Sequence, residues 1–244
     1  MSRTAPRHPA EAALAREVDA ARALHADRAR DAVLDRALER LAQWQSNRLL
    51  VTCADLVAQP RFRDAIAFFR SDLYGGEDIA RRDADLARVV PVMSAALPEK
   101  VIATVARAME LNVLSQQLDR LVLARLPLPD AAFGVAQYCR AYRAATDAEP
   151  RRRQIALIVE IGTALDAYVR KPLLRTTLAM MRGPARLAGV GALHDFLERG
   201  FDAFKRMHGA SAFLETVRSR ETAILEAILA GSDDPFPDPG SEPA

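Results

Sequence analysis

The chain has 244 residues, half of which are hydrophobic, so most of it should fold. Aromatic residues make up only 6% of the chain and there are 11 glycines, a composition that argues against a large β-sandwich or barrel. The 34 basic and 32 acidic residues leave a net charge of +2, so a nucleic-acid or acidic-membrane partner is not expected.

The sequence gives no sign of export or of membrane insertion. The first residues lack the apolar core of a secretory signal, and no apolar run approaches the ~18–20 residues of a membrane span. Cys53 and Cys139 lie far apart within helical patterns, which is typical of buried thiols in a reducing compartment. We therefore expect a cytoplasmic protein.

Apolar residues at helical spacing predict an all-α protein with no strand. Pro91 should kink or divide one helix, Pro172 should bend another, and Gly183-Pro184 should end it. We expect seven to nine mostly antiparallel helices in one domain, residues 10–231, between a disordered arm (1–9) and a disordered tail (232–244). The expected helices cover about 10–26, 28–58, 60–75, 78–96, 98–125, 130–146, 150–183, 193–207 and 211–230.

The near-neutral total charge conceals an uneven distribution. Asp233, Asp234, Asp238 and Glu242 lie in the tail without a basic residue, whereas the arm carries two arginines and no acid. Removing these from the totals of 34 and 32 leaves a net charge of +4 on residues 10–231. A weak contact between the acidic tail and the basic body is therefore plausible.

Polar residues recur along one side of the helix expected over 28–58. Gln45, Arg48, Thr52 and Asp55 are spaced i, i+3, i+7 and i+10 and share one face. Such a face is most simply solvent-exposed, but it could also be a buried hydrogen-bond network or the wall of a polar pocket.

The run Phe68-Phe69-Arg70-Ser71-Asp72-Leu73-Tyr74 resembles the signature of the bacterial FFLEELY motif proteins. The resemblance spans about residues 29–231, and it implies a helical domain without implying an activity. Arg70, Ser71 and Asp72 depart from the family's Leu-Glu-Glu, so only one acid remains there. The other residues that carry the resemblance, and are therefore candidate site residues, are Trp44, Gln45, Arg48, Asp55, Arg82, Asp83, Asn112, Asp119, Arg220 and Glu221.

The aromatic motif has two interpretations. Phe68, Phe69, Leu73 and Tyr74 could line a ligand pocket, although an apolar stripe at helical spacing is ordinarily a core face. Asp72 could pair with Arg82 and brace the intervening Gly75-Gly76 turn.

No familiar catalytic or metal-binding pattern occurs. His194 and His208 are too far apart along a helix to share one ion, and H-E-x-x-H is absent. His25 or His194 could serve as a lone haem ligand. Arg151-Arg152-Arg153 at a helix start is most simply a solvated cluster, with an anion or partner contact as the alternative. We predict no catalytic, cofactor-binding or metal-binding residues.

The sequence therefore favours a non-catalytic protein that works by binding a protein partner or by self-association. The alternative is a small-ligand-binding or cofactor-dependent helical enzyme with an internal pocket near Arg48, Asp55 and Tyr74. The pocket requires Arg48 and Asp55 to be buried and to face a cavity walled by Tyr74 or Asn112. The interaction function requires an exposed apolar patch.

Overall fold

Helices provide all the regular structure of the described residues, 8–73, 77–126, 132–145 and 147–240, in a computed structural model. The side chains of 72, 73, 77, 78, 91–96, 172 and 173 also lie outside this description. The all-α prediction is confirmed, but the described residues form eleven helices in one domain rather than seven to nine. They are α1 (Pro9–Arg30), α2 (Ala32–Thr52), α3 (Ala54–Val57), α4 (Pro60–Leu73), α5 (Glu77–Ala96), α6 (Glu99–Leu123), α7 (Val135–Ala145), α8 (Ala148–Val169), α9 (Pro172–Leu187), α10 (Gly191–Arg206) and α11 (Ser211–Leu229).

The helix predicted over 28–58 is in fact interrupted twice. Asp31 has an extended backbone, and its carboxylate accepts hydrogen bonds from the amides of Val33 and Leu34, so it caps α2 and separates α2 from α1. Cys53 ends α2, and the single turn of α3 follows. Asp55 therefore lies on α3 and does not continue the polar face of α2.

The chain is divided near Pro172, where only a bend was predicted, and it is not divided at the two other predicted places. The α5 helix continues through Pro91, and α9 continues through Gly183-Pro184, so neither is divided there. Pro172 does not bend a helix but occupies the first turn of α9, where its missing amide hydrogen is not needed. Gly189, whose φ of 70° is accessible to glycine, follows the end of α9 and provides the stop expected at Gly183.

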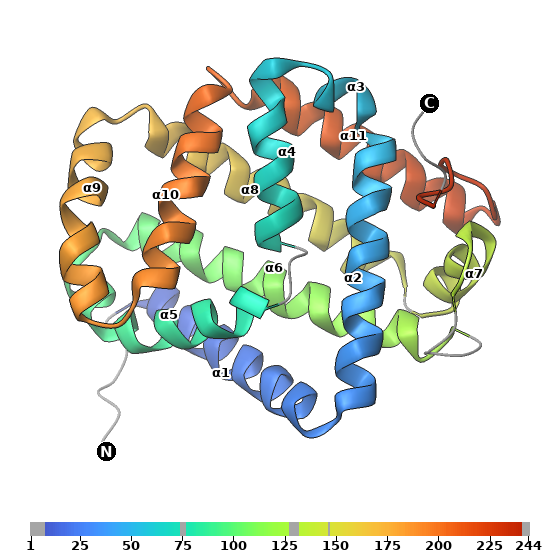
Figure 1. Ribbon diagram of the computed structural model, residues 1–244, viewed down its shortest axis with the longest axis horizontal. Coiled ribbons are helices and arrows are strands. Elements are labelled where there is room, and N and C mark those ends of the chain that lie inside the picture. The colour runs from blue at the N-terminus through green and yellow to red at the C-terminus, as the bar shows by residue number, and fades with distance from the viewer. Residues whose placement is uncertain (1–7, 74–76, 127–131, 146, 241–244) are drawn as a thin grey trace.

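The helices form two crossed layers (Figure 1). In one layer α9, α10, α4 and α2 stand side by side, and α6 and α8 cross behind them. The α1 helix packs along α6, α11 packs on α8, and α7 lies at one end of the molecule, where it contacts both α6 and α11. The α2 helix therefore contacts α6 and lies close to α11. The polar face of α2 is turned toward these helices and lies inside the molecule.

Three apolar clusters stabilise this arrangement. One joins α2, α6, α7 and α11, a second joins α3, α4, α10 and α11, and the third joins α1, α5 and α6. Both cysteines are buried in the first two clusters as free thiols, as predicted. Burial raises the pKa of Cys139 to about 11 and raises that of Cys53 as well, so both thiols are protonated and unreactive at neutral pH.

The predicted disorder of the tail does not hold for residues 232–240. Phe236 is only 5% exposed and belongs to the first apolar cluster. Asp233 pairs with Arg140 and Arg143 on α7, which is the tail-to-body contact that the charge distribution suggested. One buried aromatic residue and one paired acid anchor a segment whose composition is typical of disordered chains.

Candidate functional site

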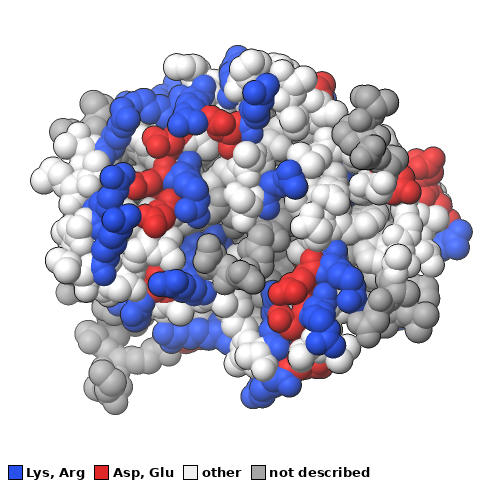
Figure 2. All heavy atoms as spheres, viewed as in Figure 1, with Lys and Arg blue, Asp and Glu red and all other residues white. Residues whose placement is uncertain are grey.

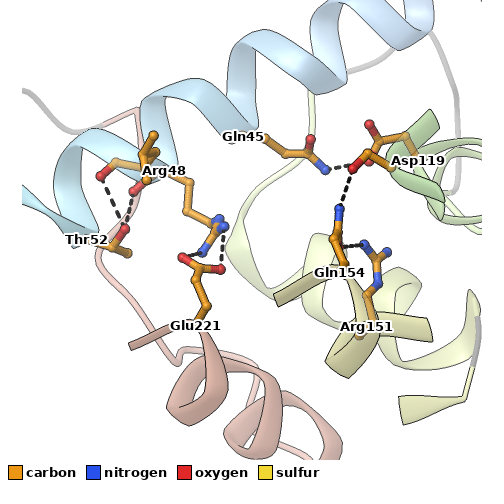
Figure 3. Close-up of polar contacts among 9 residues, drawn as sticks. Gln45, Arg48, Thr52, Asp119, Arg151, Gln154 and Glu221 are labelled. Atoms are coloured by element: carbon orange, nitrogen blue, oxygen red, sulfur yellow. Dashed lines mark hydrogen bonds and ion pairs between the residues drawn. The ribbon is translucent and has the colours of Figure 1, made fainter. Parts of the chain in front are cut away.

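The polar face of α2 is a buried network and not a solvent-exposed surface (Figure 3). Gln45 is 6% exposed and Arg48 is 8% exposed, and both point toward partners on other helices. Thr52 is different, because its hydroxyl donates back to the carbonyl of Arg48 at 2.9 Å within its own helix. The interpretation as a simple exposed face was therefore wrong for Gln45 and Arg48.

Arg48 and Glu221 form a two-pronged ion pair between α2 and α11. The two terminal nitrogens of the guanidinium donate to the two carboxylate oxygens at 3.1 and 2.9 Å. The side chains are 9% and 18% exposed, so little water competes for these bonds. The parallel geometry fixes the orientation of one helix relative to the other.

A second polar group joins α2 to α6. The Gln45 amide donates to Asp119 at 2.9 Å. Shielding of the Asp119 carboxyl from water raises its pKa, and the Gln45 hydrogen bond and the positive charge of Arg151 offset only part of this effect. Burial also raises the pKa of the neighbouring Tyr138.

The network continues onto α8, where Arg151 is only 3% exposed. Its guanidinium donates to Gln154 at 3.2 Å and stacks 4.0 Å from the ring centroid of Tyr142, while Gln154 donates to Ser115 at 2.8 Å. This buried position contradicts the prediction of a solvated cluster at residues 151–153.

The other two arginines of that cluster also have partners. Arg152 donates to Glu226 at 2.8 Å, and Arg153 holds both carboxylate oxygens of Glu110 at 2.8 and 2.9 Å. The three arginines therefore join α8 to α6, α7 and α11 instead of presenting one basic surface.

Asp55 and Arg220 form an exposed pair beside this network. Arg220 donates to both Asp55 oxygens at 2.6 and 2.7 Å and also to the carbonyl of Thr52 at 2.9 Å. The guanidinium lowers the pKa of Asp55, mainly through these hydrogen bonds. The Asp55 side chain is 58% exposed, so it does not face an internal pocket.

Asp83 is the centre of a separate buried group between α1, α5 and α6. The carboxylate is 4% exposed and lies 2.9 Å from the ring nitrogen Nε2 of His25. Asn112 donates to the same carboxylate oxygen at 2.7 Å and accepts from Gln116 at 3.1 Å. Both His25 and Asn112 are thus engaged with protein groups, and Asn112 does not join the Arg48 network.

The aromatic motif contributes to the core and not to a ligand pocket. Phe68 is 8% exposed and packs on Phe196 and against Gly200, where a Cβ would lie 2.9 Å from its ring. Phe69 stacks on Phe213. The small Gly200 is what admits the Phe68 ring at the α4–α10 contact.

Three residues of the motif cannot be placed as predicted. The side chains of Asp72 and Leu73, and the whole of Tyr74, lie outside the described residues. The proposed pair between Asp72 and Arg82 is therefore untested, although the Arg82 guanidinium stacks 4.1 Å from the ring centroid of Phe196.

The described residues of the predicted pocket do not face a common cavity. Arg48 is buried but paired, Asp55 is exposed, and Asn112 belongs to another group. A hollow of about 370 Å³ lies at α1, α6 and the start of α8, but Glu17, Glu110 and Arg153 line it and none of the candidate site residues does. Within the described ranges no group of three His, Cys, Asp or Glu residues could hold a metal ion.

The sequence did not predict several members of these networks. Tyr138 and Phe133 pack around Trp44, with ring centroids 4.4 and 5.2 Å away, and Phe236 completes the group at 6.0 Å. Phe236 is the only aromatic residue of the tail, a signal that could have suggested its burial. The burial of Arg151 had no such signal, because the spacing within one helix does not show which neighbouring helices cover it.

The fold and its buried polar networks define an all-helical domain. The chain belongs to a family: the model described as "Domain of unknown function (DUF8198)" matches residues 24–235, which covers most of the helical domain. Neither the curated proteins nor the solved structures contained a match. Within the described chain, no helix is both long and apolar enough to cross a membrane.

Proposed function

We propose that this protein is a non-catalytic cytoplasmic protein that binds an acidic protein partner through the outward face of α9. One observation carries the proposal. Met180 is 73% exposed and Leu187 is 92% exposed, although both are large apolar side chains. They are seven residues apart, so they lie on the same side of the helix two turns from each other.

Further apolar side chains extend this surface. Met181 and Leu174 of α9 are 49% and 39% exposed, and Leu197 of the adjacent α10 is 44% exposed. We call these five residues the α9 surface. Exposed apolar residues that gather on one element are typical of interaction sites, and methionine adapts its shape to a partner.

The charge on α9 itself is positive, and the acids nearest to it lie on α10. No acidic residue occurs between Asp166 and Asp195, whereas Arg175, Arg182 and Arg186 all lie on α9. Arg182 pairs with Glu198, but no described residue forms an ion pair with Arg175 or Arg186. On the side of the molecule where α9 lies, Figure 2 shows uncharged atoms beside basic side chains, with acidic side chains among them.

This charge supports an acidic partner over the other possible occupants. A second copy docked about a two-fold axis would bring like-charged arginines together, which opposes self-association through α9. Membrane-surface helices typically insert aromatic side chains, and α9 has none. A partner helix that carries an apolar stripe flanked by acids satisfies both features of the surface.

The alternative of a small-ligand or cofactor-dependent enzyme has less support. It required Arg48 and Asp55 to face a common internal cavity, whereas Arg48 is paired with Glu221 and Asp55 is 58% exposed. No specific observation favours it.

Photo-crosslinking in the native host tests the proposal. A photoreactive residue at position 180 is compared with one at Val33, which is 48% exposed but lies on α2. We expect a discrete adduct with one acidic protein at position 180 only, which disappears when Arg175 and Arg186 are both changed to Glu. Absence of an adduct, equal adducts at both positions, or an adduct between two copies of this chain would contradict the proposal.

Binding experiments with the purified chain distinguish a protein partner from a lipid surface at α9. The crosslinked protein should bind the wild-type chain more weakly as salt is increased, because the arginines contribute to the attraction. Vesicles of phosphatidylcholine and phosphatidylserine (7:3) should not sediment with the chain. Binding to these vesicles at physiological salt would contradict the proposal and would show that the chain binds a lipid surface.

A further inference from the structure

The tail occupies a socket whose walls come from the helical domain. The Phe236 ring packs against Trp44 and Tyr138, with ring centroids 6.0 and 6.3 Å away. The Arg48 guanidinium lies 5.6 Å from the same ring centroid. The floor of the socket is therefore built from α2 and α7, and it encloses an aromatic side chain almost completely, since Phe236 is 5% exposed.

A second anchor lies three residues before Phe236. The Asp233 carboxylate accepts from Arg140 at 2.8 Å and from Arg143 at 3.1 Å, and these two arginines lower its pKa. Arg143 also donates to the carbonyl of Ile228 at 2.8 Å, which holds the guanidinium in place at the end of α11. The socket thus has a basic end and an aromatic end.

Side chains, and not regular secondary structure, hold the tail. Residues 232–240 form no helix or strand, and the amides of Asp234 and Gly240 bond to side chains only two residues away. The segment Asp-Asp-Pro-Phe-Pro-Asp-Pro is also rich in proline, which restricts an unbound peptide and lowers the entropy lost on docking. The docking of a proline-rich segment on aromatic side chains is one of the ways in which folded domains recognise short peptides.

We infer that this socket is a peptide-binding site, and that its ligand class is a short peptide in which an aspartate precedes a phenylalanine by three residues. The tail of the chain is its intramolecular ligand. A peptide of the same chemistry from another protein competes with the tail for Arg140, Arg143 and the Trp44 side of the socket. The site is separate from the α9 surface, so the inference does not depend on the proposed function.

Trp44 is the only tryptophan of the chain, so its fluorescence reports directly on the socket. The test uses the full chain with Asp233→Ala and Phe236→Ala, which disables the intramolecular ligand, and a synthetic peptide of residues 232–244 as the probe. We expect a saturable blue shift of the Trp44 emission as the peptide fills the socket. Wild-type chain should not respond at the same concentrations, because its tethered tail has a high effective concentration.

Two matched controls make the result specific. A peptide with Phe236→Ala should bind at least tenfold more weakly, and so should the unchanged peptide added to a chain that also carries Arg140→Glu and Arg143→Glu. A folded double variant that shows no saturable response, or that binds the altered peptide equally well, would overturn the inference.

Hydrogen exchange of the wild-type chain tests the inference even if the double variant does not fold. The tail must leave the socket without global unfolding for a peptide to exchange with it. We therefore expect the amides of the non-proline residues between 233 and 240 to exchange much faster than those in the middle of α11. Equal protection of the tail and of α11 would show that the tail is a fixed part of the core and not a ligand.

Discussion

Arg48 and Glu221 show how a polar pair can specify helix geometry without any catalytic role. Two hydrogen bonds connect the side chains, and they join helices that are far apart in the chain. Removing one partner leaves an enclosed charge with no counter-charge, which is much more costly than removing both.

A double-mutant cycle measures this difference. Arg48→Met should lower the free energy of unfolding by about 3 kcal/mol, since Glu221 is left enclosed and unpaired. Glu221→Leu should cost a similar amount, and the double variant should lose less than the sum of the two. Additive losses in urea unfolding would show that the two charges do not interact.

Because the pKa of Asp119 is raised in the folded chain, we expect the free energy of unfolding to depend on pH. Burial raises this pKa, so the folded chain holds the proton more tightly than the unfolded chain, whose Asp pKa is about 3.9. Stability is therefore lost as the pH rises from about 4 through the pKa of the folded state.

Asp119→Asn cannot ionise and keeps an oxygen that accepts from Gln45. We expect this variant to gain stability over the wild type above about pH 4, by up to about 1.4 kcal/mol for each pH unit of the titration range. Urea unfolding at pH 4 and at pH 7.5 checks this. A gain that is larger at pH 4 would mean that the carboxylate is favourably ionised in the folded chain.

At the scale of elements, the sequence predicted helices well wherever the apolar spacing was long. The α4, α6, α10 and α11 helices fall within a few residues of their predicted bounds. The errors lie where a local cap or a distant contact decides the structure. The side-chain cap of Asp31 interrupts a sequence pattern that is otherwise compatible with one helix. The chain stays helical through Gly183-Pro184 and leaves the helix only before Gly189, whose φ is positive.

In the candidate site, too, the sequence predicted which residues matter but not which residues they contact. The resemblance selected Gln45, Arg48, Asp119 and Glu221, which do meet in or beside the buried network. Their pairing could not be predicted, because spacing within one helix does not determine which other helix faces it. The assignment of Asp55 to the same face depended on an uninterrupted helix, and it failed when Cys53 ended α2.

The contacts of the tail with the cluster that includes α7 should contribute measurably to the free energy of unfolding. Phe236→Ala removes a buried ring from the cluster around Trp44 and Tyr138 and should lower the free energy of unfolding by about 3 kcal/mol. Changing the exposed Pro237 to Ala provides the matched control, with a small effect. Similar losses for both variants in urea unfolding would show that the ring does not anchor the tail.

For the whole molecule, the distribution of charge makes the α9 surface a poor site for self-association. We therefore expect light scattering to give the mass of one chain, 26.7 kDa, at micromolar concentration and at low and high salt. A dimer that dissociates on Met180→Glu would show that a second copy, and not an acidic partner, covers the α9 surface.

The most direct measurement is the affinity of the crosslinked partner for three purified chains. We predict that the double variant Arg175→Glu/Arg186→Glu binds at least tenfold more weakly than the wild type, and that Val33→Glu binds as the wild type does. Equal affinities of the wild type and the double variant, with both chains folded, would contradict the claim that α9 binds an acidic partner.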